Sequence, residues 1–377
     1  MRMSSATGTH RDLHGERRRE GPPGRADNPV VKVCGLAWLE FRKPDLDRAE
    51  IFAQAFGFGV AWRTPDELWL RGSDAGAPCL IVRRGPASAL TGLAFAAADR
   101  SDVHRLASAT GMTVAALPEG LGGVAVDLVD PNGLTVRVVS DTDEVPGLQP
   151  QHAYTMNVGH DTPRVNAAQR PPRAPAVVQR LGHVVLQSTT FQRTLDWYLR
   201  HLGLIVSDFL YFPGQRDRGP TMSFVRCDLG LTPADHHTIA LALGPSNRYV
   251  HSAYQVADLD ALAAGGEYLR ELGFKRSWGI GRHLQGSQIF DYWRDPDGVL
   301  MEHYSDGDLF DHTVEPGWAP MTASGLAQWG PRATKDFLGI APGRRAVREL
   351  VAMLTSLRED NEWDVARMRG LMKVAAS

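Results

Sequence analysis

The stretch LGHVVLQSTTFQRTLDWYLRHLGLIVSD (181–208) repeats the layout of an earlier stretch, CGLAWLEFRKPDLDRAEIFAQAFGFGVAWR (34–63). Each contains a short apolar strand pattern, a polar turn, an amphipathic helix pattern, a glycine where that helix ends and a second strand pattern. Such internal similarity is the sequence signature of a structural unit that the chain uses more than once. The repeat therefore predicts that the two halves of the chain share one fold.

Two later pairs of stretches extend the repeat. HSAYQVADLDALAAGGEYLRELGF (251–274) matches GLAFAAADRSDVHRLASATGM (92–112), and RDPDGVLMEHYSD (294–306) matches VDPNGLTVRVVSD (129–141). In the second pair, Asp-Pro-Asp/Asn-Gly is a tight turn that leads into a terminal strand. The chain is thus predicted to contain four β-α-β-β-β units, at 32–84, 92–139, 180–243 and 249–304.

A small sheet with a single covering helix cannot bury its apolar face alone, so the four units must pair. The predicted fold class is α+β with mixed sheets, in which the two units of each half curl around a central cleft. Composition breaks divide the chain further. We expect a disordered polar tail (1–29), a first domain (30–141), a proline-rich linker (142–179), a second domain (180–306) and a C-terminal extension with an amphipathic helix (307–377).

Charge and cysteine content narrow the class of function. The 41 Lys and Arg residues nearly balance the 43 Asp and Glu residues, which leaves no electrostatic reason to expect a nucleic acid or an anionic membrane as partner. Three cysteines without CxxC spacing predict neither a disulfide framework nor a zinc knuckle. No segment is apolar and long enough for a signal peptide or a membrane span, so a cytoplasmic protein is expected.

At three aligned positions, the two halves differ in whether the side chain can bind a metal ion. In the second half they are two histidines and a carboxylate, whereas none of the first-half side chains binds a cation well. Because the repeat relates the strands that carry them, we expect the three second-half residues to face one cleft. The pairs are His183 with Leu36, His251 with Gly92, and Glu302 with Arg137.

Two neutral imidazoles and one carboxylate on one side of a metal ion leave three coordination positions open. Such a set suits Fe(II) that must hold an organic substrate and O2 together. Mn(II) accepts the same ligands, and zinc enzymes use similar ones, so the ligand types alone do not fix the metal. The second domain is therefore predicted to hold a divalent metal ion at His183, His251 and Glu302.

The second half resembles the catalytic half of the extradiol ring-cleavage dioxygenases in the vicinal oxygen chelate superfamily. The motifs that carry the resemblance are GHVVL (182–186), HHTIAL (236–241), VHSAYQVAD (250–258), GRHLQGSQIFDYWRDPDG (281–298) and LMEHYSDGD (300–308). The resemblance implies the two-domain fold of that superfamily over residues 31–306, with the metal site in the C-terminal domain. It also implies a small aromatic diol as substrate and O2 as co-substrate.

By the same resemblance, His183, His251 and Glu302 would be the metal ligands. His283 would form hydrogen bonds beside them, and Tyr292 would donate to the substrate oxygens. A further acid/base histidine lies in HHTIAL, where His237 fits the family pattern better by the residues that follow it and His236 fits slightly better by its distance to His251. Since neighbouring strand side chains point to opposite faces, only one of this pair is expected to reach the cleft.

Extradiol cleavage of a catechol, in the breakdown of aromatic compounds, is thus the expected function. Other enzymes of the superfamily, such as 2-keto-acid dioxygenases and glyoxalase-like isomerases, are alternatives. A non-catalytic binder of small molecules, as in resistance proteins of the same fold, is another, although such binders generally lack a complete ligand triad. A homo-oligomer is expected from exposed sheet edges or the helix of the tail.

Overall fold

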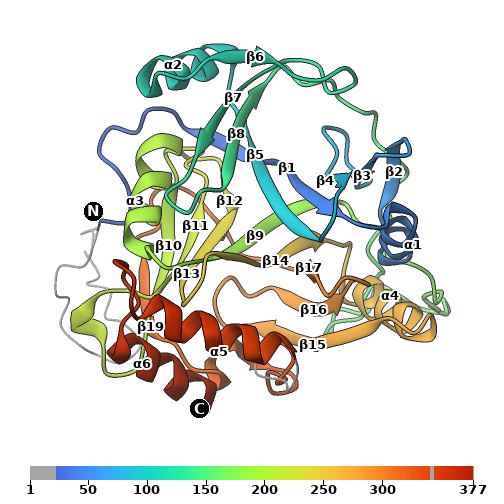
Figure 1. Cartoon of the computed structure of the whole chain (residues 1–377). Helices are drawn as coiled ribbons and strands as arrows, with labels where there is room; N and C mark the ends of the chain where they lie inside the picture. Colours follow the sequence, from blue (N-terminus) through green and yellow to red (C-terminus); the bar gives the residue numbers. More distant parts are fainter. Residues whose placement is uncertain (1–22, 340–343, 377) are drawn as a thin grey trace, which may run out of the picture.

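The computed structural model describes residues 23–339 and 344–376, and its first half forms one mixed sheet (Figure 1). Helices α1 (Leu46–Phe56) and α2 (Arg100–Thr110) connect its strands. The strands are β1 (Val33–Lys43), β2 (Gly59–Arg63), β3 (Glu67–Arg71), β4 (Leu80–Arg84), β5 (Ala89–Ala97), β6 (Val114–Ala116), β7 (Val124–Val129) and β8 (Thr135–Ser140). Their order in the sheet is β2-β3-β4-β1-β5-β8-β7-β6.

The second half forms a larger mixed sheet with helices α3 (Phe191–Leu202) and α4 (Leu259–Glu271). Its strands are β9 (Arg180–Ser188), β10 (Ile205–Tyr211), β11 (Met222–Arg226), β13 (Ile239–Leu243), β14 (Arg248–Gln255), β15 (Lys275–His283), β16 (Ile289–Arg294), β17 (Leu300–Ser305), β19 (Gly317–Pro320) and β20 (Ala327–Trp329). The order is β19-β10-β11-β13-β9-β14-β17-β16-β15-β20. A separate pair joins β12 (Ala234–Asp235) to β18 (Leu309–Phe310).

Strand pairing confirms the predicted α+β fold of four β-α-β-β-β units. In the first half, β1 is antiparallel to β5 and parallel to β4, and β5 is parallel to β8. In the second half, β9 is antiparallel to β14 and parallel to β13, and β14 is parallel to β17. The first strands of the two units in each half pair directly, so each half has one continuous sheet instead of two separate small ones.

Helix ends follow from the local sequence. Asp45 accepts a hydrogen bond from the backbone N–H of Arg48 at 3.0 Å, which satisfies a free amide at the start of α1. Gly57 ends α1 with φ +108°, and a Cβ there would lie 1.6 Å from the carbonyl oxygen of Ala176. A glycine is therefore required at this position, both for the backbone conformation and for the close approach of the linker.

The Asp-Pro-X-Gly turn of each half binds the other half. Asp130, in the first-half turn, accepts a hydrogen bond from the Tyr198 hydroxyl at 3.2 Å. In the second-half turn, Asp295 and Asp297 both accept from Lys43, the latter at 3.0 Å. Lys43 and Asp295 are only 7% and 5% exposed, so this is a buried ion pair that joins the two halves.

Segments outside the repeats add to the second sheet. β19 pairs with β10, and β20 pairs with β15, so strands of the C-terminal extension flank the sheet at its two ends. Near the N-terminus, Arg25 donates to the carbonyl oxygen of His312 at 2.7 Å. Residues 1–22 of the predicted polar tail lie outside the described residues, and the division into domains stays a prediction.

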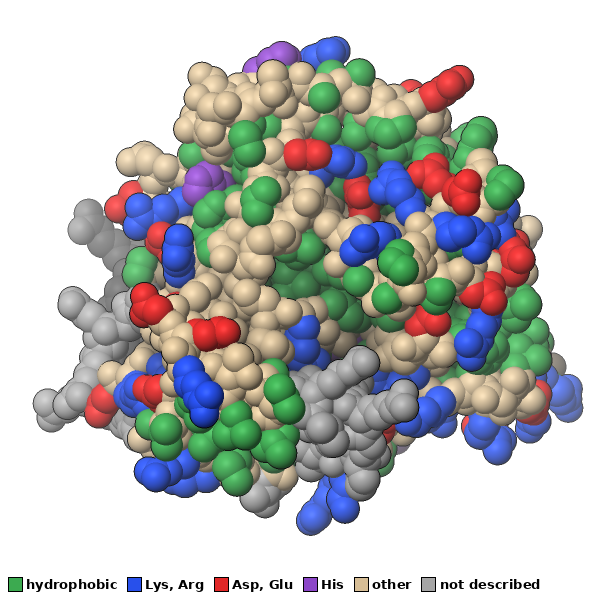
Figure 2. All heavy atoms as spheres, viewed as in Figure 1, with side chains coloured by type: hydrophobic (Ala, Val, Ile, Leu, Met, Phe, Trp, Pro, Cys, Tyr) green, Lys and Arg blue, Asp and Glu red, His purple; other side chains and the backbone are tan. Residues whose placement is uncertain are grey.

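The predicted tail helix is present as α5 (Arg344–Ser356), followed by α6 (Val365–Ala376). The sequence pattern RRAVRELVAMLTSLRED predicts an apolar face that includes Val347, whose side chain lies outside the described part of the structure. Leu350, Val351 and Leu354 are exposed, and Figure 2 shows hydrophobic side chains gathered over this region. None of the helices in the described part of the chain has the length and apolarity that crossing a bilayer requires.

We predict that Lys43→Met lowers the free energy of unfolding by about 3–5 kcal/mol, because it leaves two carboxylates of the domain interface without their cation. Arg84→Met is the matched control, since its ion pair with Asp66 is exposed and is expected to contribute about 0–1 kcal/mol. Guanidinium denaturation of both variants measures the difference. Equal small losses would contradict a stabilising role for the buried pair.

Candidate metal centre

Three neighbouring strands of the second sheet bring His183, His251 and Glu302 together. These residues lie on β9, β14 and β17, which pair side by side in that order. The Nε2 atoms of His183 and His251 lie 3.4 and 3.2 Å from the same carboxylate oxygen, Oε2 of Glu302. One ligand atom from each residue lies within 4.8 Å of the others, a spacing at which a single ion can contact all three.

The three side chains are enclosed. His183 is 2% exposed, His251 is 8% exposed and Glu302 has no exposed surface. Neither carboxylate oxygen of Glu302 has a hydrogen-bond partner among the described residues. A buried charge without such a partner is costly unless an ion pair or a metal ion compensates it.

The protonation states of His183 and Glu302 favour binding of a cation. Burial lowers the pKa of His183, so its imidazole is neutral. Burial alone would raise the pKa of Glu302, but the neighbouring His183, His251 and His283 hold it well below its ordinary value. A carboxylate and two neutral imidazoles are the ligands that divalent iron, manganese and zinc accept, so the residues present fit such an ion.

The other predicted site residues surround this triad. The His237 ring centroid lies 3.9 Å from that of His183, and the Tyr292 ring packs edge-on against His251 at 5.1 Å. His283 Nε2 lies 2.8 Å from the Tyr292 hydroxyl and 3.6 Å from Glu302. The structure thus brings all six residues into one cluster.

Hydrogen bonds fix the direction of the His283–Tyr292 contact. Nδ1 of His283 lies 2.8 Å from the carbonyl oxygen of Leu326, which can only accept, so this nitrogen carries the proton. When His283 is neutral, its Nε2 is the acceptor, and the Tyr292 hydroxyl donates to it. Burial, together with the charge of Glu302, raises the pKa of Tyr292 well above its ordinary value, so the hydroxyl keeps its proton.

The two histidines of HHTIAL differ in their surroundings. His237 contacts His183, whereas Nε2 of His236 lies 2.7 Å from Oδ2 of Asp208. We expected the two histidines to lie on a strand and to point to opposite faces. They lie instead in the bend between β12 and β13, where their Nδ1 atoms are 3.0 Å apart. Geometry therefore favours His237 for direct contact with a ligand at the metal position.

Tyr304 and Asp208 are neighbours of the site that sequence reasoning missed. The Tyr304 hydroxyl is buried with no hydrogen-bond partner among the residues that the structure describes, and its ring lies 5.7 Å from that of His183. Tyr304 follows Glu302 by two residues on one strand, so strand alternation could have placed it on the same face. Asp208 has no comparable signal, because its strand is brought to His236 only by the folded sheet.

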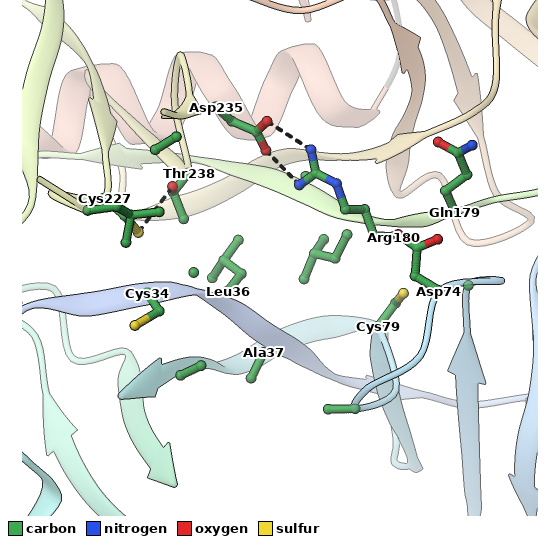
Figure 3. Close-up of a pocket in the computed structure, with 18 of the residues that line it drawn as sticks. Cys34, Leu36, Ala37, Asp74, Cys79, Gln179, Arg180, Cys227, Asp235 and Thr238 are labelled. Atoms are coloured by element: carbon green, nitrogen blue, oxygen red, sulfur yellow. Dashed lines mark hydrogen bonds and ion pairs between the residues drawn. The ribbon is translucent and has the colours of Figure 1, made fainter. Parts of the chain in front are cut away.

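A cavity of about 530 Å³ is lined by residues of both halves, and the three triad residues are not among them (Figure 3). Arg180 and Asp235 form a double hydrogen-bonded ion pair at its edge, at 2.6 and 2.8 Å. All three cysteines line it as free thiols. Burial raises the pKa of Cys79 to about 11 and that of Cys227 to about 12, so these thiols stay protonated.

Comparison with known proteins agrees with this fold and site. Residues 180–303 match the family model described as the Glyoxalase/Bleomycin resistance protein/Dioxygenase superfamily. This stretch covers most of the second half of the chain, so that half is similar to proteins of this superfamily. The match spans all three residues of the triad, and it confirms the resemblance that the motifs indicated.

The chain is also similar to two named enzymes. The chain is 29% identical over 333 residues to metapyrocatechase 2 of Cupriavidus necator, which covers 88% of this chain and 98% of the relative. It is 24% identical over 155 residues to an iron-dependent extradiol dioxygenase of Rhodococcus jostii, covering 40% of this chain and 50% of the relative.

Solved structures confirm the fold. A Mn(II)-bound glyoxalase from Novosphingobium aromaticivorans superposes with a TM-score of 0.67 and 25% identity, covering 81% of this chain and 94% of that one. A variant of homoprotocatechuate 2,3-dioxygenase from B. fuscum, in complex with HPCA, gives a TM-score of 0.68 and 19% identity, with 83% of each chain covered. The architecture of this protein is that of the superfamily.

We predict that His251→Ala abolishes stoichiometric binding of a divalent metal, since it removes one of three ligands and leaves Glu302 buried beside a single imidazole ligand. His104→Ala, the same change at an exposed position on α2, is the control and is expected to keep full metal content. Elemental analysis after loading and desalting measures both. Unchanged metal content in His251→Ala would contradict the ligand assignment.

Proposed function

We propose that this protein is an extradiol dioxygenase that opens a catechol-type ring next to its hydroxyls with O2, using Fe(II) held by His183, His251 and Glu302. The observation that carries the proposal is the buried Glu302 carboxylate between two imidazoles, with His237, His283 and Tyr292 around it. The length-wide similarity to metapyrocatechase 2 and the likeness to an iron-dependent extradiol dioxygenase support this reaction.

The metal would provide two things when bound: it would favour the deprotonated form of a catechol hydroxyl, and it would hold diol and dioxygen close together. Mn(II) is an alternative ion, since it accepts the same ligands and is bound by the glyoxalase from Novosphingobium aromaticivorans. The facial arrangement of three protein ligands leaves one side for the two substrates.

His237 is the proposed acid/base of the reaction. Burial, with His183 and His236 close by, holds its pKa well below the ordinary value, so the resting imidazole is neutral. A neutral imidazole can accept the proton that the diol loses and return it later to the reacting oxygen. The ring of Phe224 packs edge-on against the His237 ring, with their centroids 5.0 Å apart.

Tyr292 and His283 are proposed to orient the diol. The Tyr292 hydroxyl now donates to His283, and a substrate oxygen near Glu302 would compete for this proton. His283 is anchored at its other nitrogen by the Leu326 carbonyl, so its ring cannot turn freely. The nearly complete burial of Tyr292 keeps bulk water from this position.

A glyoxalase-type isomerisation is the second candidate, because a structure at 25% identity carries that name. It would use the same three ligands for proton transfer without O2. As further parts of the proposal, the protein acts in the cytoplasm and assembles into a homo-oligomer, for which the exposed Leu350, Val351 and Leu354 on α5 offer an apolar surface.

Anaerobic reconstitution with Fe(II) or Mn(II), followed by admission of O2 to a panel of catechols, tests the function. We expect oxygen uptake equal to the diol consumed, with a yellow ring-opened product. The same preparations are assayed for isomerisation of a 2-oxoaldehyde–thiol adduct. Isomerisation without oxygen uptake, or inactivity of a fully loaded protein on every catechol, would refute the proposal.

We further predict that His237→Ala lowers kcat by about 10²–10⁴-fold, the usual contribution of a general acid–base group. Metal content is expected to stay complete, because His237 is not one of the three ligands. The corresponding change at the exposed His104 leaves kcat unaltered. Steady-state oxygen uptake and elemental analysis measure the two quantities, and a kcat within threefold of the parent protein would remove His237 from the mechanism.

A further inference from the structure

Three polar side chains form a line that leads away from the metal centre. Oδ2 of Asp208 lies 2.7 Å from Nε2 of His236, and Nδ1 of His236 lies 3.0 Å from Nδ1 of His237. The His237 ring in turn lies 3.9 Å from the ring of His183. Both histidines are buried, at 1% and 3% exposure, so water does not compete for the contact between them.

His236, the middle member of this line, is closely packed. Gly286, at φ +78°, packs so closely that a Cβ would lie 2.9 Å from Nδ1 of His236. The rings of Phe224 and Phe310 lie 5.5 and 5.3 Å from the His236 ring. These contacts restrict rotation of the His236 ring away from its hydrogen-bond partners.

The His236 backbone is fixed as well. Its N–H donates to the carbonyl oxygen of Asp308 at 2.9 Å, and its own carbonyl accepts from the Ser207 hydroxyl at 2.6 Å. Ser207 receives a hydrogen bond from the fully buried guanidinium of Arg226 at 2.8 Å. Asp208 follows Ser207 directly on β10, so one strand positions both the backbone and the ring of His236.

Donor and acceptor roles along the line follow from Asp208. An ionised carboxylate only accepts hydrogen bonds, so Nε2 of His236 must carry a proton. When His236 is neutral, its Nδ1 is an acceptor, and Nδ1 of His237 is the donor. This leaves Nε2 of His237, the other nitrogen of that ring, with a free lone pair.

We propose that Asp208 is a positioning residue that acts through His236 to fix the tautomer of His237, so that Nε2 of His237 is the proton-accepting atom of the site. The catalytic consequence rests on the proposed function: a proton lost by the diol would go to Nε2 of His237, while Nδ1 keeps its proton and its bond to His236. The tautomer itself is independent of any reaction.

Asparagine at position 208 tests this assignment, because its side-chain amide can either donate or accept at the same place. The full-length protein, loaded with diamagnetic Zn(II) and labelled with ¹⁵N-histidine, is compared with Asp208→Asn by NMR, and His237→Ala assigns the resonances. We expect one His237 tautomer with the proton on Nδ1 in the parent protein and a mixture in Asp208→Asn. A proton on Nε2 in the parent, or no change in the variant, would overturn the proposal.

A double-mutant cycle adds a kinetic readout that a structural role would not reproduce. Asp208→Asn is expected to lower kcat by about 10–100-fold with KM within twofold, as is usual when an outer hydrogen-bond partner is removed. In the His237→Ala background the same change is expected to have no further effect. Equal losses in both backgrounds would show that Asp208 acts on stability instead of on His237.

Asp196→Asn is the matched control. It changes an exposed aspartate on α3 that pairs with Arg200, and it leaves kcat unchanged.

The NMR spectra and the assay of catechol cleavage distinguish failure of the proposed function from failure of the proposed role of Asp208. If the parent protein cleaves no catechol, the proposed function fails and the ¹⁵N spectra alone decide the tautomer. If it cleaves catechols but the spectra show Nε2 protonated, the function stands and the role of Asp208 is refuted.

Discussion

The Glu302 carboxylate has no exposed surface and no hydrogen-bond donor among the described residues. The second half of the chain must therefore compensate the negative charge of this group. Burying an unpaired carboxylate costs several kcal/mol, so the fold can keep it ionised only beside a cation. The neighbouring strands β14 and β9 supply two imidazoles, whose Nε2 atoms lie 3.2 and 3.4 Å from one oxygen of this carboxylate. A divalent ion at this place would at once stabilise the fold and create the reaction centre.

The first half uses the same scaffold without such a charge. Arg137 takes the place of Glu302 there, and its guanidinium pairs with Glu40 at 2.5 Å and with Asp127 at 2.7 Å. Glu40 also binds Arg83 at 2.8 Å, so a network of ion pairs lies where the second half has Glu302. This half serves to support its partner: His303, next to Glu302, points the other way and donates to the carbonyl oxygen of Phe56 at 2.7 Å. The strand that carries the carboxylate is therefore anchored on the first half of the chain.

The C-terminal extension supports the centre from two directions. β19 pairs with β10, where Gly317 lies opposite Asp208, and β20 pairs with β15, where Ala327 lies opposite His283. The Leu326 carbonyl binds His283, and the ring of Phe337 packs 4.8 Å from that of Tyr292. A segment that matches no repeat unit thus fixes the side chains that surround the triad, while the repeat units provide the triad itself.

The amino-acid sequence by itself determined the four units, their pairing in halves and the three residues of the triad, because strand and helix periods, the Asp-Pro-X-Gly turns and the asymmetry between aligned halves are local properties of the chain. His283, Tyr292 and the HHTIAL histidines were indicated by the family resemblance of their motifs, which left His236 and His237 as alternatives. It did not determine that each half forms one continuous sheet, that HHTIAL lies in a bend, or that Asp208 and the Leu326 carbonyl reach the site. Those contacts join residues 28 to 43 positions apart in the chain, or depend on which strand edges remain free for β19 and β20. Only tertiary packing decides such distances, because no local propensity encodes which distant segment lies beside a given side chain.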